Sequence, residues 1–252
     1  MTAHLAAIYR HPIKSHGREN LQAVVLTQGQ CMPWDRHWAV THERSKWQDT
    51  DPQWLACTNF LIGSGNPRIM AVNAVLEPAG PLLTLTHPDL PPLAFHPGQP
   101  DENARFLDWL APLVPEGRAA TALVKAPGRG MTDSDYPSVS LANLASGTAL
   151  SERMGEDLSP LRWRCNLWVE GWHPWAENDL LGRRLQVGAA VLAIRERIGR
   201  CKSTTANPGT GRADVDTLAG LRSHTGAQDF GVYAEVVVGG ELHLGDRIEV
   251  LA

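Results

Sequence analysis

The sequence predicts an α+β fold that is mainly β-structure, and three features lead to this prediction. Most of the 252-residue chain consists of short apolar runs separated by turns that contain Gly, Pro or Asp. Only a few segments place apolar residues at helical spacing. The sequence shows no internal repeat and no low-complexity tract. We therefore expect a strand-rich chain with a tendency to form a barrel.

The predicted strands follow one another along the whole chain. They cover residues 5–10, 21–27, 37–42, 69–77, 82–86, 121–125, 162–170, 185–187, 190–198, 231–238 and 241–251. The last two have the clearest pattern, because a Val- and Tyr-rich run precedes Gly239-Gly240 and apolar residues alternate after it. A two-residue Gly-Gly loop is typical of a β-hairpin. We therefore expect the last two strands to pair with each other.

Three helices are predicted. Residues 101–113 and 139–154 carry apolar side chains at helical spacing, and a short third helix covers 214–223. Proline is dense at 88–100, and the segment "KAPGRG" at 125–130 looks like a connector.

The composition is that of a soluble globular protein, with 43% hydrophobic and 20% charged residues. A formal net charge of −4 gives no basic field for nucleic acid or an anionic membrane. No apolar run reaches the roughly 18 residues that a membrane helix needs. The N-terminus meets charge and proline too early for a signal peptide, so we expect a cytoplasmic protein.

The cysteines and histidines match no common metal motif. Four cysteines occur singly, at positions 31, 57, 165 and 201, with no C-x-x-C pair, and the histidines form no H-E-x-x-H arrangement. These spacings argue against a zinc ribbon, an iron–sulfur cluster or a thioredoxin-type redox site.

Cys201 stands between a strand-like run and the polar loop "KSTTANPGTG". A residue at a strand end can point into a cleft, and its neighbours Arg200 and Lys202 are cationic. Positive neighbours favour the thiolate, which is the form that attacks substrates or binds metals. The alternative, a small side chain tucked under a loop, stays open on this local pattern.

The N-terminal segment "YRHPIKSHGRE" offers a second group of polar residues. Lys14 and Ser15 supply an ammonium and a hydroxyl after the first predicted strand, which suits an anion such as phosphate. Arg36 stands at the entry to the next apolar stretch. In isolation, Lys-Ser in a loop is more typical of a solvated surface, and Asp-Arg of a surface or a local ion pair.

The segment "LRWRCNLWVEG" places Arg162, Arg164 and Asn166 at alternate positions, so that in a strand they would share one face. Their tryptophan neighbours predict burial, and buried polar groups need partners. A ligand would supply them, and so would an internal salt bridge with Glu170 or Glu177.

Eight segments, in this order, resemble the landmarks of one known family. Near the N-terminus these are "YRHPIKS" and "DRHWAV". Later ones are "DSDYPSVSLANLAS", "RWRCNLWVEG", "PWAENDLLGRRLQVG", "IGRCKSTTANPGTG", "FGVYAEVV" and "LHLGDRIEV". Together they resemble the MOSC family, the molybdenum-cofactor sulfurase C-terminal domain group, and the first two resemble the MOSC N-terminal region of the amidoxime-reducing proteins. This resemblance implies a MOSC-type β-barrel built from residues 1–36 and 127–252, with a smaller MOSC N-terminal region at 37–126.

The resemblance also implies a cofactor site for molybdenum bound to a phosphorylated pterin. Cys201 matches the family's protein ligand to molybdenum. Lys14, Ser15 and Arg36 match positions that hold the phosphate and the dithiolene-bearing skeleton of the pterin.

Further positions are implied in the C-terminal half. Arg164 and Asn166 match an Arg-x-Asn pair that contacts the pterin, and the proline common between them is Cys165 here. Thr204 and Thr205 fall in the loop beside the metal. Asp133, Ser138 and Ser140 fall in a region that approaches the cofactor, and Asp133 would assist proton delivery.

The function implied is that of an oxidoreductase that removes oxygen from N-hydroxylated compounds such as amidoximes, hydroxylamines and N-hydroxylated bases. The segment "GSGNPR" at 63–68 lacks the context of a nucleotide-binding fingerprint, so we expect electrons from a separate reductase, iron–sulfur or haem protein. Two alternatives remain. Cys201 could carry a persulfide received from a pyridoxal-phosphate-dependent desulfurase, or the chain could be a non-catalytic carrier of the cofactor.

Overall fold

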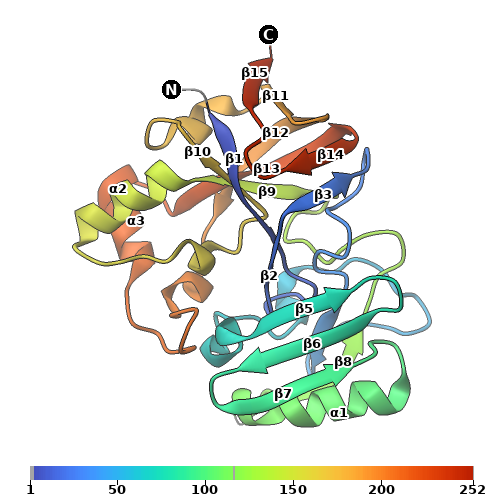
Figure 1. The fold of residues 1–252 in the computed structure, drawn as a ribbon. Coiled ribbons are helices and arrows are strands. Elements are labelled where there is room, and N and C mark those ends of the chain that lie inside the picture. The colour runs from blue at the N-terminus through green and yellow to red at the C-terminus, as the bar shows by residue number, and fades with distance from the viewer. Residues whose placement is uncertain (1–2, 116, 252) are drawn as a thin grey trace.

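The computed structural model describes residues 3–115 and 117–251 and consists of two β-rich parts (Figure 1). The larger part is built on an eight-stranded sheet whose strands lie in the order β15-β11-β12-β13-β9-β10-β1-β2. Its strands are β1 (His4–Arg10), β2 (Glu19–Leu21), β9 (Val139–Asn143), β10 (Leu167–Glu170), β11 (Arg184–Val187), β12 (Ala190–Gly199), β13 (Asp229–Val238) and β15 (Ile248–Leu251). All neighbours are antiparallel except β9 and β10.

The large sheet curls until β15, at one edge, meets β1, the strand next to the other edge. Leu5 N donates to Asp246 O at 2.8 Å, and Ile248 N donates to Ala3 O at 2.9 Å. The interior is filled by apolar side chains of alternating residues, among them Ile8, Leu192 and Val232, which are fully buried. The predicted mainly β, barrel-like architecture is confirmed.

The smaller part has its own apolar core. A three-stranded sheet of β5 (Asn73–Glu77), β6 (Leu82–His87) and β7 (Leu90–Phe95) and a pair of β4 (Ala39–His42) with β8 (Ala120–Val124) enclose it. The helix α1 (Pro100–Leu110) lies against these strands (Figure 1) and buries Phe106 and Leu110. Phe106 stacks on Phe95 with ring centroids 4.9 Å apart.

Two further helices cover the outside of the large sheet. They are α2 (Leu144–Met154) and α3 (Thr217–Thr225), capped by Asn143 and Asp216 respectively. Short 3₁₀ segments connect the other elements: η1 (Cys57–Asn59), η2 (Pro67–Ala71), η3 (Ala111–Leu113), η4 (Pro160–Trp163), η5 (Ala176–Leu180) and η6 (Lys202–Thr205). Among the residues that the structure describes, no helix is long and apolar enough to cross a membrane.

The predicted C-terminal hairpin is wrong. The last segments are two separate strands, of which β14 (Gly240–His243) pairs with β3 (Ala23–Leu26) and β15 pairs with β11. Neither Gly239 nor Gly240 adopts the positive φ that a tight hairpin turn needs. A side chain on Gly240 would collide with Ala189. The glycine therefore allows two segments of the chain to pass close to each other, and it does not form a hairpin turn.

Three other expectations change. Residues 139–143 form a strand instead of the first turn of the predicted helix. The proline-dense stretch contains β7, an edge strand, where prolines are tolerated because no ladder bond is lost. Arg162 and Arg164 do not share a strand face, because η4 covers residues 160–163 and Arg164 has φ 50°.

Candidate functional site

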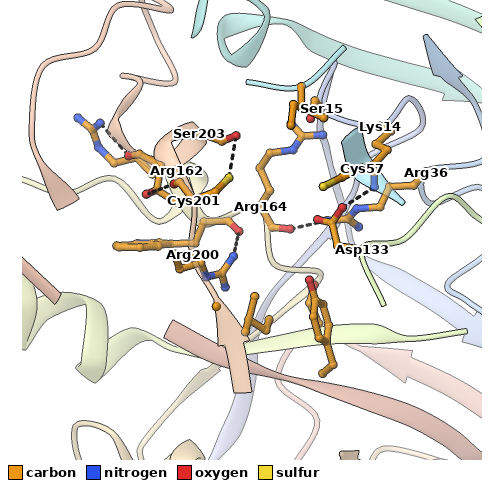
Figure 2. A pocket seen from close by; sticks show the side chains of 17 residues that line it. Lys14, Ser15, Arg36, Cys57, Asp133, Arg162, Arg164, Arg200, Cys201 and Ser203 are labelled. Carbon is orange, nitrogen blue, oxygen red and sulfur yellow. Dashed lines mark hydrogen bonds and ion pairs between the residues drawn. The ribbon is translucent and has the colours of Figure 1, made fainter. Parts of the chain in front are cut away.

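A cavity of about 200 Å³ lies between the two parts of the molecule (Figure 2). One water needs only ~15 Å³, so the cavity can hold a ligand much larger than a single ion. Its lining combines two stretches that are far apart in sequence, the segments around residues 14–62 and 133–233. Five cationic side chains and one carboxylate line it: Lys14, Arg36, Arg162, Arg164, Arg200 and Asp133. The cavity therefore favours an anionic ligand.

Cys201 is exposed at this cavity, directly after β12. The chain turns sharply there, because the N–H and the hydroxyl of Thr204 both donate to Cys201 O, at 3.2 and 3.1 Å. The thiol lies 3.2 Å from Ser203 Oγ, as Figure 2 shows. The site thus presents an accessible sulfur at the end of a strand.

Arg162 holds the loop that follows Cys201. Its side chain is buried, with Nη1 donating to Thr205 O at 3.3 Å and Nη2 donating to Asp214 Oδ2 at 2.7 Å. Asn207 Nδ2 donates to the same carboxylate oxygen at 2.8 Å. These contacts fix the loop on which the thiol sits.

Arg164 differs from Arg162 in that its terminal nitrogens are buried without a partner among the described residues. A left-handed backbone conformation (φ 50°) directs this side chain into the cavity. Burial lowers its pKa to about 9, and Arg36 and Arg18 add to the effect. A buried cation without acceptors is costly, and a bound anion would supply them.

Arg36 is anchored by its neighbour Asp35, with which Nη1 forms a short ion pair. Its Nη2 donates to Arg164 O at 2.8 Å. Burial opposes the charge of Arg36, but Asp35 and Asp133 outweigh it and raise its pKa. Arg36 is therefore a fixed cation at the cavity wall.

Lys14 is buried and bonded within the protein. Its Nζ donates to Met131 O at 2.7 Å and forms a short ion pair with Asp133, whose side chain is half-exposed. Burial would raise the pKa of Asp133, but Lys14, Arg36 and Arg200 outweigh it and hold the pKa below its usual range. Asp133 is thus ionised at neutral pH.

The cavity brings together eight of the eleven site residues that the resemblance implies: Lys14, Ser15, Arg36, Asp133, Ser140, Arg164, Cys201 and Thr204. Three others lie outside its lining. The carboxamide of Asn166 accepts from Ser140 Oγ at 2.8 Å and donates to Tyr9 O at 3.1 Å, which joins β9 to β1. Ser138 Oγ bonds Ser134 Oγ at 2.6 Å, and Thr205 Oγ1 donates to Lys202 O at 2.8 Å.

Sequence reasoning missed several lining residues, notably Cys57, Ile62, Ser203 and Tyr233. Cys57 stands at the start of η1, where burial and then Asp133 raise the pKa of its thiol. Cys57 and Ile62 carry no motif and reach the cavity through the packing of the smaller part on the larger. Ser203 and Tyr233 lie inside the matched segments "IGRCKSTTANPGTG" and "FGVYAEVV", which could have indicated them.

Arg200 has a different place from the one its sequence position suggests. Its Nη1 donates to Trp163 O at 2.7 Å and its Nη2 lies 3.0 Å from Cys165 Sγ. Arg200, which is next to Cys201 in sequence, therefore contacts the thiol of Cys165, and it lines a wall of the same cavity.

Comparison with known proteins gives a family but no close relative. No curated protein matches the sequence. The YuaD protein from Bacillus subtilis is 15% identical, with 99% of this chain and 96% of that chain covered and a TM-score of 0.47. YiiM from Geobacillus stearothermophilus is 17% identical, with 45% and 54% covered and a TM-score of 0.36.

Two family models cover nearly the whole chain. The MOSC N-terminal beta barrel domain matches residues 2–126 and the MOSC domain matches residues 130–249. In the structure, β1 and β2 lie in the large sheet with the strands of the C-terminal half, and our division at residues 36 and 127 stays a prediction. The resemblance noted in the sequence is confirmed: this chain belongs to the MOSC domain family.

Proposed function

We propose that this protein binds a molybdenum cofactor in the cationic cavity and reduces N-hydroxylated compounds with electrons from a separate donor protein. The observation that carries the proposal is the cavity itself. It combines an exposed thiol, Cys201, with five cationic side chains, and the buried nitrogens of Arg164 have no acceptor among the described residues.

The residues fit the chemistry of such a cofactor. A thiolate is a soft ligand that suits molybdenum, so Cys201 would be the ligand to the metal. The phosphorylated pterin is an anion, and Arg164, with Arg36 beside it, would supply donors to its oxygens. When bound, the cofactor supplies the two-electron redox chemistry, and the protein supplies binding and orientation.

The reaction breaks an N–O bond. It consumes two electrons and two protons, converts the N-hydroxyl compound to the amine or amidine and releases the oxygen as water. Asp133 is ionised beside Lys14 and faces the cavity, so it can accept hydrogen bonds from substrate N–H groups. Its lowered pKa makes it a poor proton donor at neutral pH, so it would instead orient the water or substrate group that gives a proton to the leaving oxygen.

The test compares wild-type protein with Cys201→Ala, both expressed in a host that makes the cofactor. Molybdenum is quantified in each protein, and benzamidoxime reduction is measured with a dithionite-reduced dye. We expect about one molybdenum per wild-type chain, with turnover, and loss of both in the variant. Equal molybdenum in the two proteins would refute the ligand assignment.

A second candidate is a sulfur carrier, favoured by the exposure of the Cys201 thiol. In this case the protein would carry a persulfide, received in trans from a desulfurase. Cyanolysable sulfur on Cys201 without molybdenum would support this function over the first. Molybdenum cofactor without turnover would instead indicate a carrier of the cofactor.

A further inference from the structure

A second hollow, of about 400 Å³, lies next to the cationic cavity. The half-buried side chain of Ile62 lines both, so it forms part of the wall between them. The hollow is bounded by the end of β4, the segment 58–64 and the loop at 117–118. Its polar lining consists of Glu43, Arg44, Thr58, Ser64 and Arg118, together with the ring of His42.

The segment between the two hollows packs directly on the loop of Cys201. A side chain on Gly63 would come within 3.2 Å of Ser203 Cβ. Ser203 is two residues from Cys201 and contacts its thiol. The second hollow therefore lies beside the reactive end of the first cavity, on the other side of Ile62.

The hollow carries an excess of positive charge. The ring of His42 is held in place, with Nε2 2.9 Å from Thr58 O and Nδ1 accepting from Arg44 N at 3.1 Å. The guanidinium and carboxylate groups of the lining are those of Arg44, Arg118 and Glu43, which give two positive charges against one negative charge.

The position of Arg118 depends on a glycine. A Cβ atom at Gly65 would overlap Nη1 of Arg118, so this end of the guanidinium lies against bare backbone. A guanidinium fork binds carboxylate or phosphate with two parallel hydrogen bonds. The hydroxyls of Thr58 and Ser64 line the same hollow and can donate to such a group.

We infer that this hollow is a subsite for an anionic group on the substrate, so that the preferred substrates are N-hydroxylated compounds that bear a carboxylate or phosphate. This inference rests on the proposed function. The cofactor also carries a phosphate. The test must therefore distinguish an anionic group of the substrate from the phosphate of the cofactor as the group that binds in this hollow.

The test compares benzamidoxime with 4-carboxybenzamidoxime on the cofactor-loaded enzyme. We expect a higher kcat/KM for the carboxylate-bearing compound in the wild type. In Arg118→Glu, the ratio of the two kcat/KM values should fall about tenfold, as expected for losing a hydrogen bond to a charged group. Arg153→Glu is the matched control, because Arg153 is exposed on α2 and lines neither hollow, and its ratio should equal that of the wild type.

Calorimetry with 4-carboxybenzamidoxime gives a readout that is independent of turnover. We expect Arg118→Glu to weaken its binding by the same factor. If the wild type binds the compound through Arg118 but reduces neither substrate, the proposed function fails and the subsite stands. An unchanged ratio and unchanged binding would overturn the subsite. Loss of molybdenum in Arg118→Glu would also overturn it, because the anion would then belong to the cofactor.

Discussion

Replacing Arg164 by methionine should stabilise the protein when it is free of cofactor. The guanidinium nitrogens are buried, lack partners among the described residues and lie near other cations, Arg36 and Arg18. Methionine keeps much of the aliphatic stem but removes the charge. The variant therefore relieves a cost of folding that the wild type bears for the sake of binding an anion.

The magnitude follows from the pKa. A fall from 12.5 to about 9 corresponds to an upper limit of about 5 kcal/mol of destabilisation in the protonated state. Because the residue as a whole is partly exposed, we expect a gain of about 2 kcal/mol. The folded-state pKa of this base is lowered, so the cost is fully present below pH 9. It shrinks as the pH rises from about 9 towards 12.5.

Urea denaturation of cofactor-free protein at pH 7 measures this difference. Arg162→Met is the matched control, because the side chain of Arg162 is also buried but is paired with Asp214 and the carbonyl of Thr205. Its loss should destabilise the protein by about 2–3 kcal/mol, since Asp214 is itself partly exposed. The two substitutions remove the same group and should act with opposite sign.

Added phosphate gives a second measurement on the same proteins. At ten times its dissociation constant, phosphate should stabilise the wild type by about 1.4 kcal/mol and Arg164→Met by much less. The reasoning is refuted if Arg164→Met is less stable than the wild type in phosphate-free buffer. It is also refuted if phosphate stabilises both proteins equally.

Three further substitutions test other parts of the structure. Lys14→Met should cost about 2 kcal/mol in urea denaturation. Because the folded state lowers the pKa of Asp133, the difference in unfolding free energy between wild type and variant is present above pH 3.8. It is lost as the pH falls through the lowered pKa of Asp133. An equal difference in strong acid would contradict the pairing. Gly211→Ala should lower the free energy of unfolding by about 2–3 kcal/mol and Tm by several degrees. Gly211 has φ 67°, and an added Cβ would lie 2.6 Å from Arg68 Cα. An unchanged Tm would show that the loop can move. Glu177→Gln should stabilise the protein by about 1 kcal/mol at pH 8 and not at pH 4. Burial raises the pKa of this acid, so the cost of ionising it in the folded state grows as the pH rises from 4.5 to the raised value and is constant above it. Equal stabilisation at both pH values would exclude that cause.

The strand pattern of the sequence predicted most of the fold because alternation reports which side of a sheet is buried. It could not predict the partner of each strand. Gly239-Gly240 has the sequence of a hairpin turn, yet β14 pairs with β3 from the other end of the chain. The prolines at 91 and 92 argued against a strand at the position of β7. Prolines are tolerated there only because β7 lies at the edge of its sheet, which the sequence does not show.

The sequence predicted those residues of the candidate site that lie in short segments matching the family. It missed residues such as Cys57, which reach the cavity only through tertiary packing. Cys57 follows a long irregular segment whose position depends on distant contacts. Trp54 Nε1 donates to Thr132 O at 2.8 Å, and the guanidinium of Arg129 lies 5.0 Å from the Trp54 ring centroid. Neither contact leaves a pattern in the sequence. Asn166 was chosen for its match to the family, whereas its hydrogen bonds show that it joins strands.

The cavity takes its lining from both halves of the chain, with Lys14, Arg36 and Cys57 on one side and Arg164 and Cys201 on the other. A ligand held by these residues touches both halves at once, so neither half can unfold without releasing it. Such a ligand is therefore held in full only after the two halves have folded against each other. Once loaded, the protein should resist digestion by proteases, because cleavage requires an opening that the ligand opposes.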